Sequence, residues 1–78
     1  MTPAMRKALL AKKLYVKKAS NVQGSVRIHF PNPEVQDIVL TDFESVNVFG
    51  RIGITAEDIK LSNIAQLQVA GLIQVSEK

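Results

Sequence analysis

The sequence predicts a small α+β domain: a strand-rich unit, either an antiparallel sheet or an open barrel, with one short helix near the C-terminus and a basic N-terminal arm. Three observations predict it. The chain has 78 residues, which is enough for one domain. Short apolar segments recur between residues 14 and 49, and a capped segment with the period of a helix follows them.

Residues 25–30 carry the clearest strand pattern. Val26, Ile28 and Phe30 alternate with polar residues, which is the period of a half-buried strand. Prolines 31 and 33 end this strand, because proline cannot donate a hydrogen bond to a strand ladder. Further strands are expected from the other apolar segments, at residues 14–18, 35–41, 45–49 and 72–75. We expect the segment at 35–41 to pair antiparallel with residues 25–30.

The helix signals lie in the last third of the chain. Thr55 is a capping residue, and Glu57 and Asp58 follow it in the first turn, where carboxylates are favourable. Only one turn fits before residues 62–63 offer a second start, after which apolar residues recur at helical spacing. Gly71 suits the left-handed position just beyond a helix end. One short helix is therefore expected ahead of the last strand.

Charge divides the chain unevenly. Residues 1–33 hold seven lysines and arginines and no acid, whereas residues 34–78 hold three against seven acids. This asymmetry predicts a basic arm at residues 1–18 attached to a domain at residues 19–78. The cations expected to contact a partner or an anion fall in three doublets: Arg6, Lys7, Lys12, Lys13, Lys17 and Lys18.

The arm has some helical character. Met5, Ala8 and Leu9 would share one face of a helix, but the basic doublets point around the whole circumference and leave no clean polar face. Such a helix is marginal alone. We expect the arm to be either disordered or a short helix that a partner orders, passing into extended chain near Tyr15.

Composition excludes several kinds of site. The absence of cysteine excludes disulfides and cysteine-based zinc sites, and a single histidine excludes multi-histidine metal clusters. No cofactor is predicted. No apolar run approaches the about 20 residues of a membrane span, so no membrane association is expected. A chain this short buries only about 60–65% of its unfolded surface, and association with other subunits is the remaining way to stabilise it.

His29 is the one candidate for acid–base chemistry. It lies on the polar side of the strand at residues 25–30, and Asp37 could face it across the proposed hairpin. A catalytic histidine needs a nucleophile or an orienting carboxylate within hydrogen-bond reach. We favour an exposed strand histidine with at most a structural hydrogen bond, and the sequence does not predict an enzyme.

The case for nucleic-acid binding depends on the arm. Only Tyr15 lies among the lysines, whereas stacking platforms normally place several aromatic residues on one basic sheet face. Phe30 shares its face with Val26 and Ile28, which predicts core packing. Residues 62–70 contain no lysine or arginine, so sequence-specific reading of DNA is not expected. Non-specific contact of residues 6–18 with a nucleic-acid backbone stays open.

The stretch from residue 44 to residue 75 resembles a pattern at the C-terminal end of small tailed-phage virion proteins, in which an extended segment, a capped turn, a helical unit and a glycine-bounded strand follow one another. The residues that carry it are 56–59, Ser62, Ile64, Leu67 and 70–75. The resemblance covers about two-fifths of the chain and rests on a short apolar motif. It implies a structural subunit of a virus head, neck or tail, located in the virion or, during assembly, in the host cytoplasm. It implies no catalytic or ligand-binding residue.

These observations predict a non-enzymatic structural or assembly protein. Its basic N-terminal arm would dock on a neighbouring subunit or an anionic surface, and its partners would be other subunits, copies of the same chain included. The alternative is a small nucleic-acid-binding protein without sequence specificity, of an architectural or ribosome-like kind.

Overall fold

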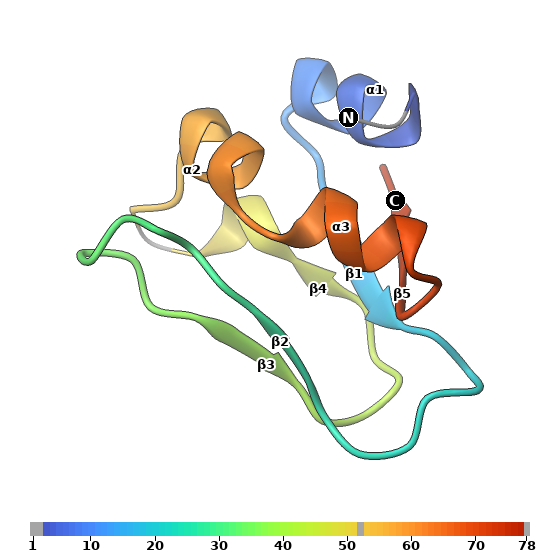
Figure 1. The fold of residues 1–78 in the computed structure, drawn as a ribbon. Coiled ribbons are helices and arrows are strands. Elements are labelled where there is room, and N and C mark those ends of the chain that lie inside the picture. Colours follow the sequence, from blue (N-terminus) through green and yellow to red (C-terminus); the bar gives the residue numbers. More distant parts are fainter. Residues whose placement is uncertain (1–2, 52, 78) are drawn as a thin grey trace.

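The structure is a computed structural model that describes residues 3–51 and 53–77 (Figure 1). In the described part the elements follow in the order α1 (Pro3–Ala11), β1 (Tyr15–Lys18), β2 (Val26–Ile28), β3 (Ile38–Leu40), β4 (Val46–Asn47), the 3-10 helix η1 (Val48–Gly50), α2 (Ala56–Leu61), α3 (Ile64–Val69) and β5 (Ile73–Ser76). This is an α+β fold with two antiparallel sheets and a few short helices. None of the described helices has the length and apolar character needed to cross a membrane.

The strands form one sheet of three and one of two. β1 is central, with β4 on one side and β5 on the other, and all pairs are antiparallel. Val16 faces Val46 in β4 and Val75 in β5. β2 and β3 form a separate hairpin, as the alternation at residues 25–30 and the segment at 35–41 predicted. In Figure 1 this hairpin lies at the lower left, and the α-helices gather along the opposite side.

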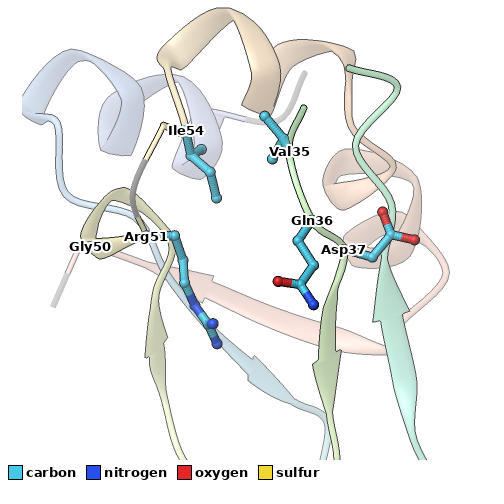
Figure 2. A pocket seen from close by; sticks show the side chains of 6 residues that line it. All are labelled: Val35, Gln36, Asp37, Gly50, Arg51 and Ile54. Atoms are coloured by element: carbon cyan, nitrogen blue, oxygen red, sulfur yellow. The ribbon is translucent and has the colours of Figure 1, made fainter. Parts of the chain in front are cut away.

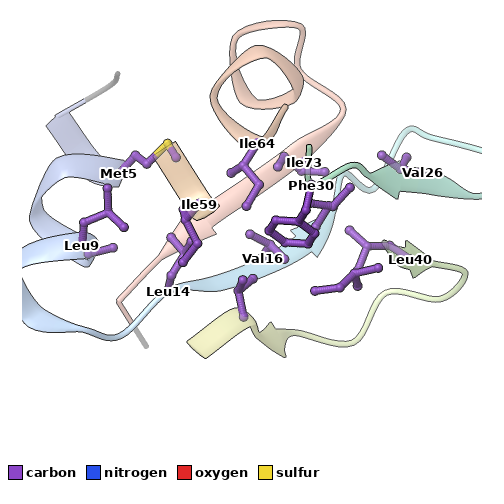
Figure 3. Packing of buried hydrophobic residues seen from close by; sticks show 14 of the residues in the cluster. Met5, Leu9, Leu14, Val16, Val26, Phe30, Leu40, Ile59, Ile64 and Ile73 are labelled. Carbon is purple, nitrogen blue, oxygen red and sulfur yellow. The ribbon is translucent and has the colours of Figure 1, made fainter. Parts of the chain in front are cut away.

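The core lies between the helices and the two sheets (Figure 3). Phe30 is 2% exposed at its centre, where the phase of its strand predicted it. Ile59 and Ile64, one from each C-terminal helix, are fully buried beside it. Val48 is also buried, and its backbone N–H donates to the Leu14 carbonyl at 2.8 Å, which prolongs the contact of β4 with β1.

The N-terminal segment packs as part of this domain. Met5, Ala8 and Leu9 lie on one face of α1 and belong to the same buried cluster as Leu14 and Val16. The predicted division between an arm at residues 1–18 and a domain at 19–78 has no counterpart in this arrangement. The physical reason is that the apolar face of α1 finds its cover within its own chain, and that β1 is the central strand of a sheet.

A sharp turn connects α1 to β1. Lys12 has a left-handed φ of +56°, and the Lys13 N–H donates to the Ala8 carbonyl at 3.0 Å. These are the features of a helix C-terminus closed by a left-handed residue, and they turn the chain into β1. Of the two alternatives for this segment, disorder or a short helix ordered by a partner, the structure has a helix, but the chain's own core covers it. Extended chain follows at Tyr15, as expected.

Two short helices occupy the region where one was expected. Thr55 caps α2 through a capping box: its hydroxyl accepts from the Asp58 N–H at 3.2 Å, and the Asp58 carboxylate accepts from the Thr55 N–H at 3.0 Å. The Thr55 hydroxyl also donates to the Asp58 carboxylate, at 3.0 Å. The bond from the Thr55 N–H first, and this bond from its hydroxyl second, lower the pKa of Asp58. Ser62 is extended, with ψ of 175°, and separates α2 from α3. Gly71 then takes the predicted left-handed conformation, with φ of +77°, and leads into β5.

Candidate functional site

The histidine–aspartate pair is present where the hairpin geometry predicted it. His29 follows β2 and Asp37 precedes β3, and the His29 Nδ1 lies 3.2 Å from both carboxylate oxygens of Asp37. The Phe30 N–H also donates to this carboxylate, at 3.2 Å. The hydrogen bond from the His29 ring, followed by that from Phe30, lowers the pKa of Asp37. The pair joins the two ends of the loop between β2 and β3.

The surroundings of the pair favour a structural role. The His29 side chain is 61% exposed, and the Asp37 carboxylate already accepts a backbone hydrogen bond. Asn63, just before α3, holds the same strand from its other side: its amide oxygen accepts from the His29 N–H at 2.8 Å, and its amide nitrogen donates to the Arg27 carbonyl at 3.2 Å. Across residues 3–51 and 53–77, no group of three or more His, Cys, Asp or Glu side chains could hold a metal ion.

A cleft of about 380 Å³ opens beside the pair, between the approach to β3 and the segment after β4 (Figure 2). One wall is formed by residues 35–37, and the other by Gly50, Arg51 and Ile54. Figure 2 shows the side chains of Arg51 and Gln36 pointing into the opening, while the Asp37 carboxylate turns away from it toward β2. The cleft thus presents hydrogen-bond donors from Arg51 and Gln36, and the carboxylate beside it is engaged with His29.

Lys18 has a role that differs from the predicted one. It is 3% exposed, and its ammonium donates to the Gly24 carbonyl at 2.7 Å and to the Thr41 carbonyl at 3.4 Å. The same ammonium lies 4.4 Å from the centre of the Phe43 ring. Lys18 therefore ties β1 to the two ends of the β2–β3 hairpin and is not accessible to a partner. Lys18 lies on the same side of the alternating segment as Leu14 and Val16, which are also buried.

The other five predicted cations are exposed, but they do not form one cluster. Arg6 and Lys7 lie on α1, Lys12 and Lys13 follow its end, and Lys17 lies on β1. Arg6 lines a groove between α1 and α2, whereas Lys17 lies on the outside of the three-stranded sheet. The six residues are therefore neither one flexible arm nor one patch.

The first surface is a groove between α1 and α2. It has a volume of about 300 Å³ and is lined by Arg6, Leu9, Leu10, Ala56 and Lys60. Leu10 is 82% exposed, and Leu61, next to Lys60 on α2, is 59% exposed. Apolar side chains form its walls, and one cation comes from each helix. Lys60 is absent from the sequence prediction, although its place four residues after Ala56 puts both on one face of α2.

The second surface is the outside of the three-stranded sheet. Burial alternates along residues 13–18, so that Lys13, Tyr15 and Lys17 lie opposite the buried side chains. Tyr15 is half-buried and is paired with Asn47 in β4 and with Ser76 in β5, and Lys17 is paired with Gln74. The strand residues on this face carry no carboxylate. The alternation of polar and apolar residues at 13–17 could have predicted this face, but the adjacent lysine doublets obscure the alternation.

Comparison with known proteins finds nothing similar. No protein-family model matches the chain, and neither the curated proteins nor the solved structures contain a match.

Proposed function

We propose that this protein is a non-enzymatic structural subunit of a larger assembly, held by contacts with further copies of itself and with other subunits. The observation that carries the proposal is the groove between α1 and α2, with Leu10 82% exposed at its edge. Contiguous apolar surface on a small protein marks an interaction site, because its exposure to water is unfavourable. The resemblance to tailed-phage virion proteins makes a head, neck or tail subunit the class proposed, located in the virion or in the host cytoplasm during assembly.

The size of the molecule supports an assembled state. The surface of the subunit is 5080 Å². A stable interface covers about 800 Å² on each partner, which is close to one sixth of this surface. One such contact therefore adds substantially to the small core, and binding that selects the folded chain raises its stability.

The structure changes the proposed means of attachment. Because Met5, Ala8 and Leu9 anchor α1 in the core, the N-terminal segment presents a fixed helix surface. A preformed surface loses less conformational entropy on binding than a flexible arm does. Attachment is accordingly assigned to the outward side of α1, and Arg6 is the member of the predicted set that lines the groove.

The test is the mass of the purified protein as a function of concentration, by sedimentation or light scattering. We expect an oligomer that Leu10→Lys dissociates, since burying a leucine side chain contributes about 1.5–3 kcal/mol. Val69→Lys is the matched control, because Val69 is 78% exposed on α3 and the same charge is added there. A wild-type protein that stays monomeric up to its solubility limit contradicts the proposal.

A second candidate function, binding of single-stranded nucleic acid, is favoured by the outer sheet face. An aromatic ring there lies between two lysines, each about 7 Å away along the strand. Bases stack on such rings while lysines contact phosphates. The test is titration of a labelled oligothymidylate against salt. Lys13→Ala/Lys17→Ala should reduce the slope of log affinity against log salt by about 1.4, because each lysine that neutralises a phosphate contributes about 0.7 to the slope. The control Lys7→Ala/Lys60→Ala removes the same charge from the helices, and an equal reduction there contradicts this candidate.

A further inference from the structure

The loop between β3 and β4 carries another exposed large apolar side chain. Phe43 is 52% exposed, and it stands between two exposed carboxylates, Asp42 and Glu44. The Glu44 N–H donates to the Asp42 carboxylate at 3.0 Å, which forms a tight turn around Phe43. This acidic turn, residues 42–44, presents an aromatic side chain flanked by two negative charges.

The groove between α1 and α2 has the opposite character. Its lining offers apolar contact from Leu9, Leu10 and Ala56, and its cations are Arg6 and Lys60. A volume of about 300 Å³ is at the lower limit of binding pockets and accommodates one aromatic ring. The acidic turn offers a protruding ring with negative charges beside it, and the groove offers an apolar hollow with positive charges beside it. The two surfaces are therefore complementary in shape and in charge.

The acidic turn and the groove lie far apart on one subunit. In Figure 1 the chain between β3 and β4 is at the bottom of the molecule, while α1 and α2 are at the top. The acidic turn cannot reach the groove of its own subunit without disrupting the strands between them. A second copy of the chain can supply it.

We propose that copies of this protein associate head to tail, with Phe43 of one copy inserted in the α1–α2 groove of the next. Asp42 and Glu44 then approach Arg6 and Lys60 of that neighbour. The inference rests on the proposed function and specifies its contact. Because the two surfaces differ, the contact is heterologous, and its repetition produces a ring if the rotation closes and a filament if it does not.

Phe43 is held in place in the free subunit and still exposes 52% of its surface to a neighbour. Its ring already rests on the Lys18 ammonium, at 4.4 Å, and the acidic turn is closed by its own hydrogen bond. A side chain held in place before binding loses less rotational freedom when it inserts. The charges around it steer approach toward a basic surface and against a second acidic one.

Complementation between two disabled variants tests the proposal. Leu10→Lys disables the groove, and Phe43→Ser disables the acidic turn. Each variant alone should weaken association about 10- to 100-fold, the change expected when one buried leucine or phenylalanine side chain is removed from an interface. Mixed together they retain one intact contact, formed by the turn of the Leu10→Lys protein and the groove of the Phe43→Ser protein. The mixture should therefore form dimers and nothing larger.

Matched controls and a charge reversal complete the experiment. Val39→Ser alters another half-exposed apolar residue, on β3, and should assemble like the wild type. Glu44→Lys should weaken assembly, and Lys60→Glu in the same chain should restore it. Thermal unfolding of every variant verifies that it is folded; if Phe43→Ser is not, the Glu44→Lys and Lys60→Glu pair decides.

The outcomes separate this inference from the broader function. One outcome is that the wild type assembles, that Leu10→Lys dissociates the assembly, and that the folded Phe43→Ser and Glu44→Lys proteins still assemble. In that case the proposed subunit function stands and the head-to-tail contact is wrong. Two dissociated variants that remain monomers when mixed also overturn it, because a heterologous contact must complement. A monomeric wild type overturns both proposals.

Discussion

Replacement of Lys18 by methionine is the most direct test of how the two sheets are joined. Lys18→Met keeps the long buried stem but removes the ammonium that donates to the Gly24 and Thr41 carbonyls. It also removes the cation above the Phe43 ring. The change therefore isolates the polar end of a side chain whose apolar part stays packed.

The magnitude follows from the two kinds of contact. A hydrogen bond to a charged group contributes about 1.5–3 kcal/mol. The bond from Lys18 to the Gly24 carbonyl is short, at 2.7 Å, whereas the bond to the Thr41 carbonyl is long, at 3.4 Å, and contributes less. A cation over a half-exposed ring adds about 0.5–1 kcal/mol. The apolar methionine end recovers part of this by burial, about 1 kcal/mol. We expect a net loss of about 2 kcal/mol, or roughly 8–16 °C in Tm for a domain of this size.

Urea unfolding followed by circular dichroism measures this loss. Lys17→Met is the matched control, because Lys17 is the exposed neighbour on β1 and the formal charge change is the same. Its effect should stay within about 0.5 kcal/mol. If both variants unfold at the same urea concentration, Lys18 does not join the sheets in the way described.

Three further predictions concern the helices and the hairpin. Met5→Ala should destabilise by about 2–5 kcal/mol in the same urea assay, because Met5 is 1% exposed in the core; a change below about 0.5 kcal/mol would mean that α1 is a free arm. Thr55→Ala removes the cap of α2 and should cost about 1 kcal/mol, with Thr41→Ala as the control. The pKa of Asp37 is lowered in the fold, so its stabilisation is present above the ordinary value of 3.8 and is lost as pH falls below it. Thermal unfolding between neutral and acid pH should show this fall, and His29→Ala should make it shallower; an unchanged profile would contradict the hydrogen-bonded contact between His29 and Asp37.

Local patterns predicted the parts of the fold whose causes are local. The strand at residues 26–28 and the burial of Phe30 follow from period-two alternation. The capping box at Thr55 and the left-handed Gly71 depend on residues within three or four positions, so the sequence alone sufficed. The contact of His29 with Asp37 was also accessible, because a hairpin brings its two ends together.

Features that depend on distant segments were not predictable in the same way. The apolar face of α1 indicates that something covers it, but not that the cover is the chain's own core. Lys18 was predicted to be one of six cations that contact a partner, because the sequence shows only its charge. The Gly24 and Thr41 carbonyls that bind it come close to each other only when β2 pairs with β3. The groove lies between two helices, α1 and α2, that are more than 40 residues apart in the sequence. No pattern within a single segment therefore predicts it.

Asn63 has a consequence for which edges of the molecule can add a strand. Its amide and backbone occupy the Arg27 carbonyl, the His29 N–H and the His29 carbonyl, the polar groups that β2 turns away from β3. One residue, through its side chain and its backbone N–H, thus takes the place of a neighbouring strand and closes this edge to pairing with another chain. In a protein proposed to assemble in many copies, that closure removes the outer edge of β2 as a place where strands of different subunits could pair. Asn63→Ala would expose the edge and turn a controlled assembly toward aggregation.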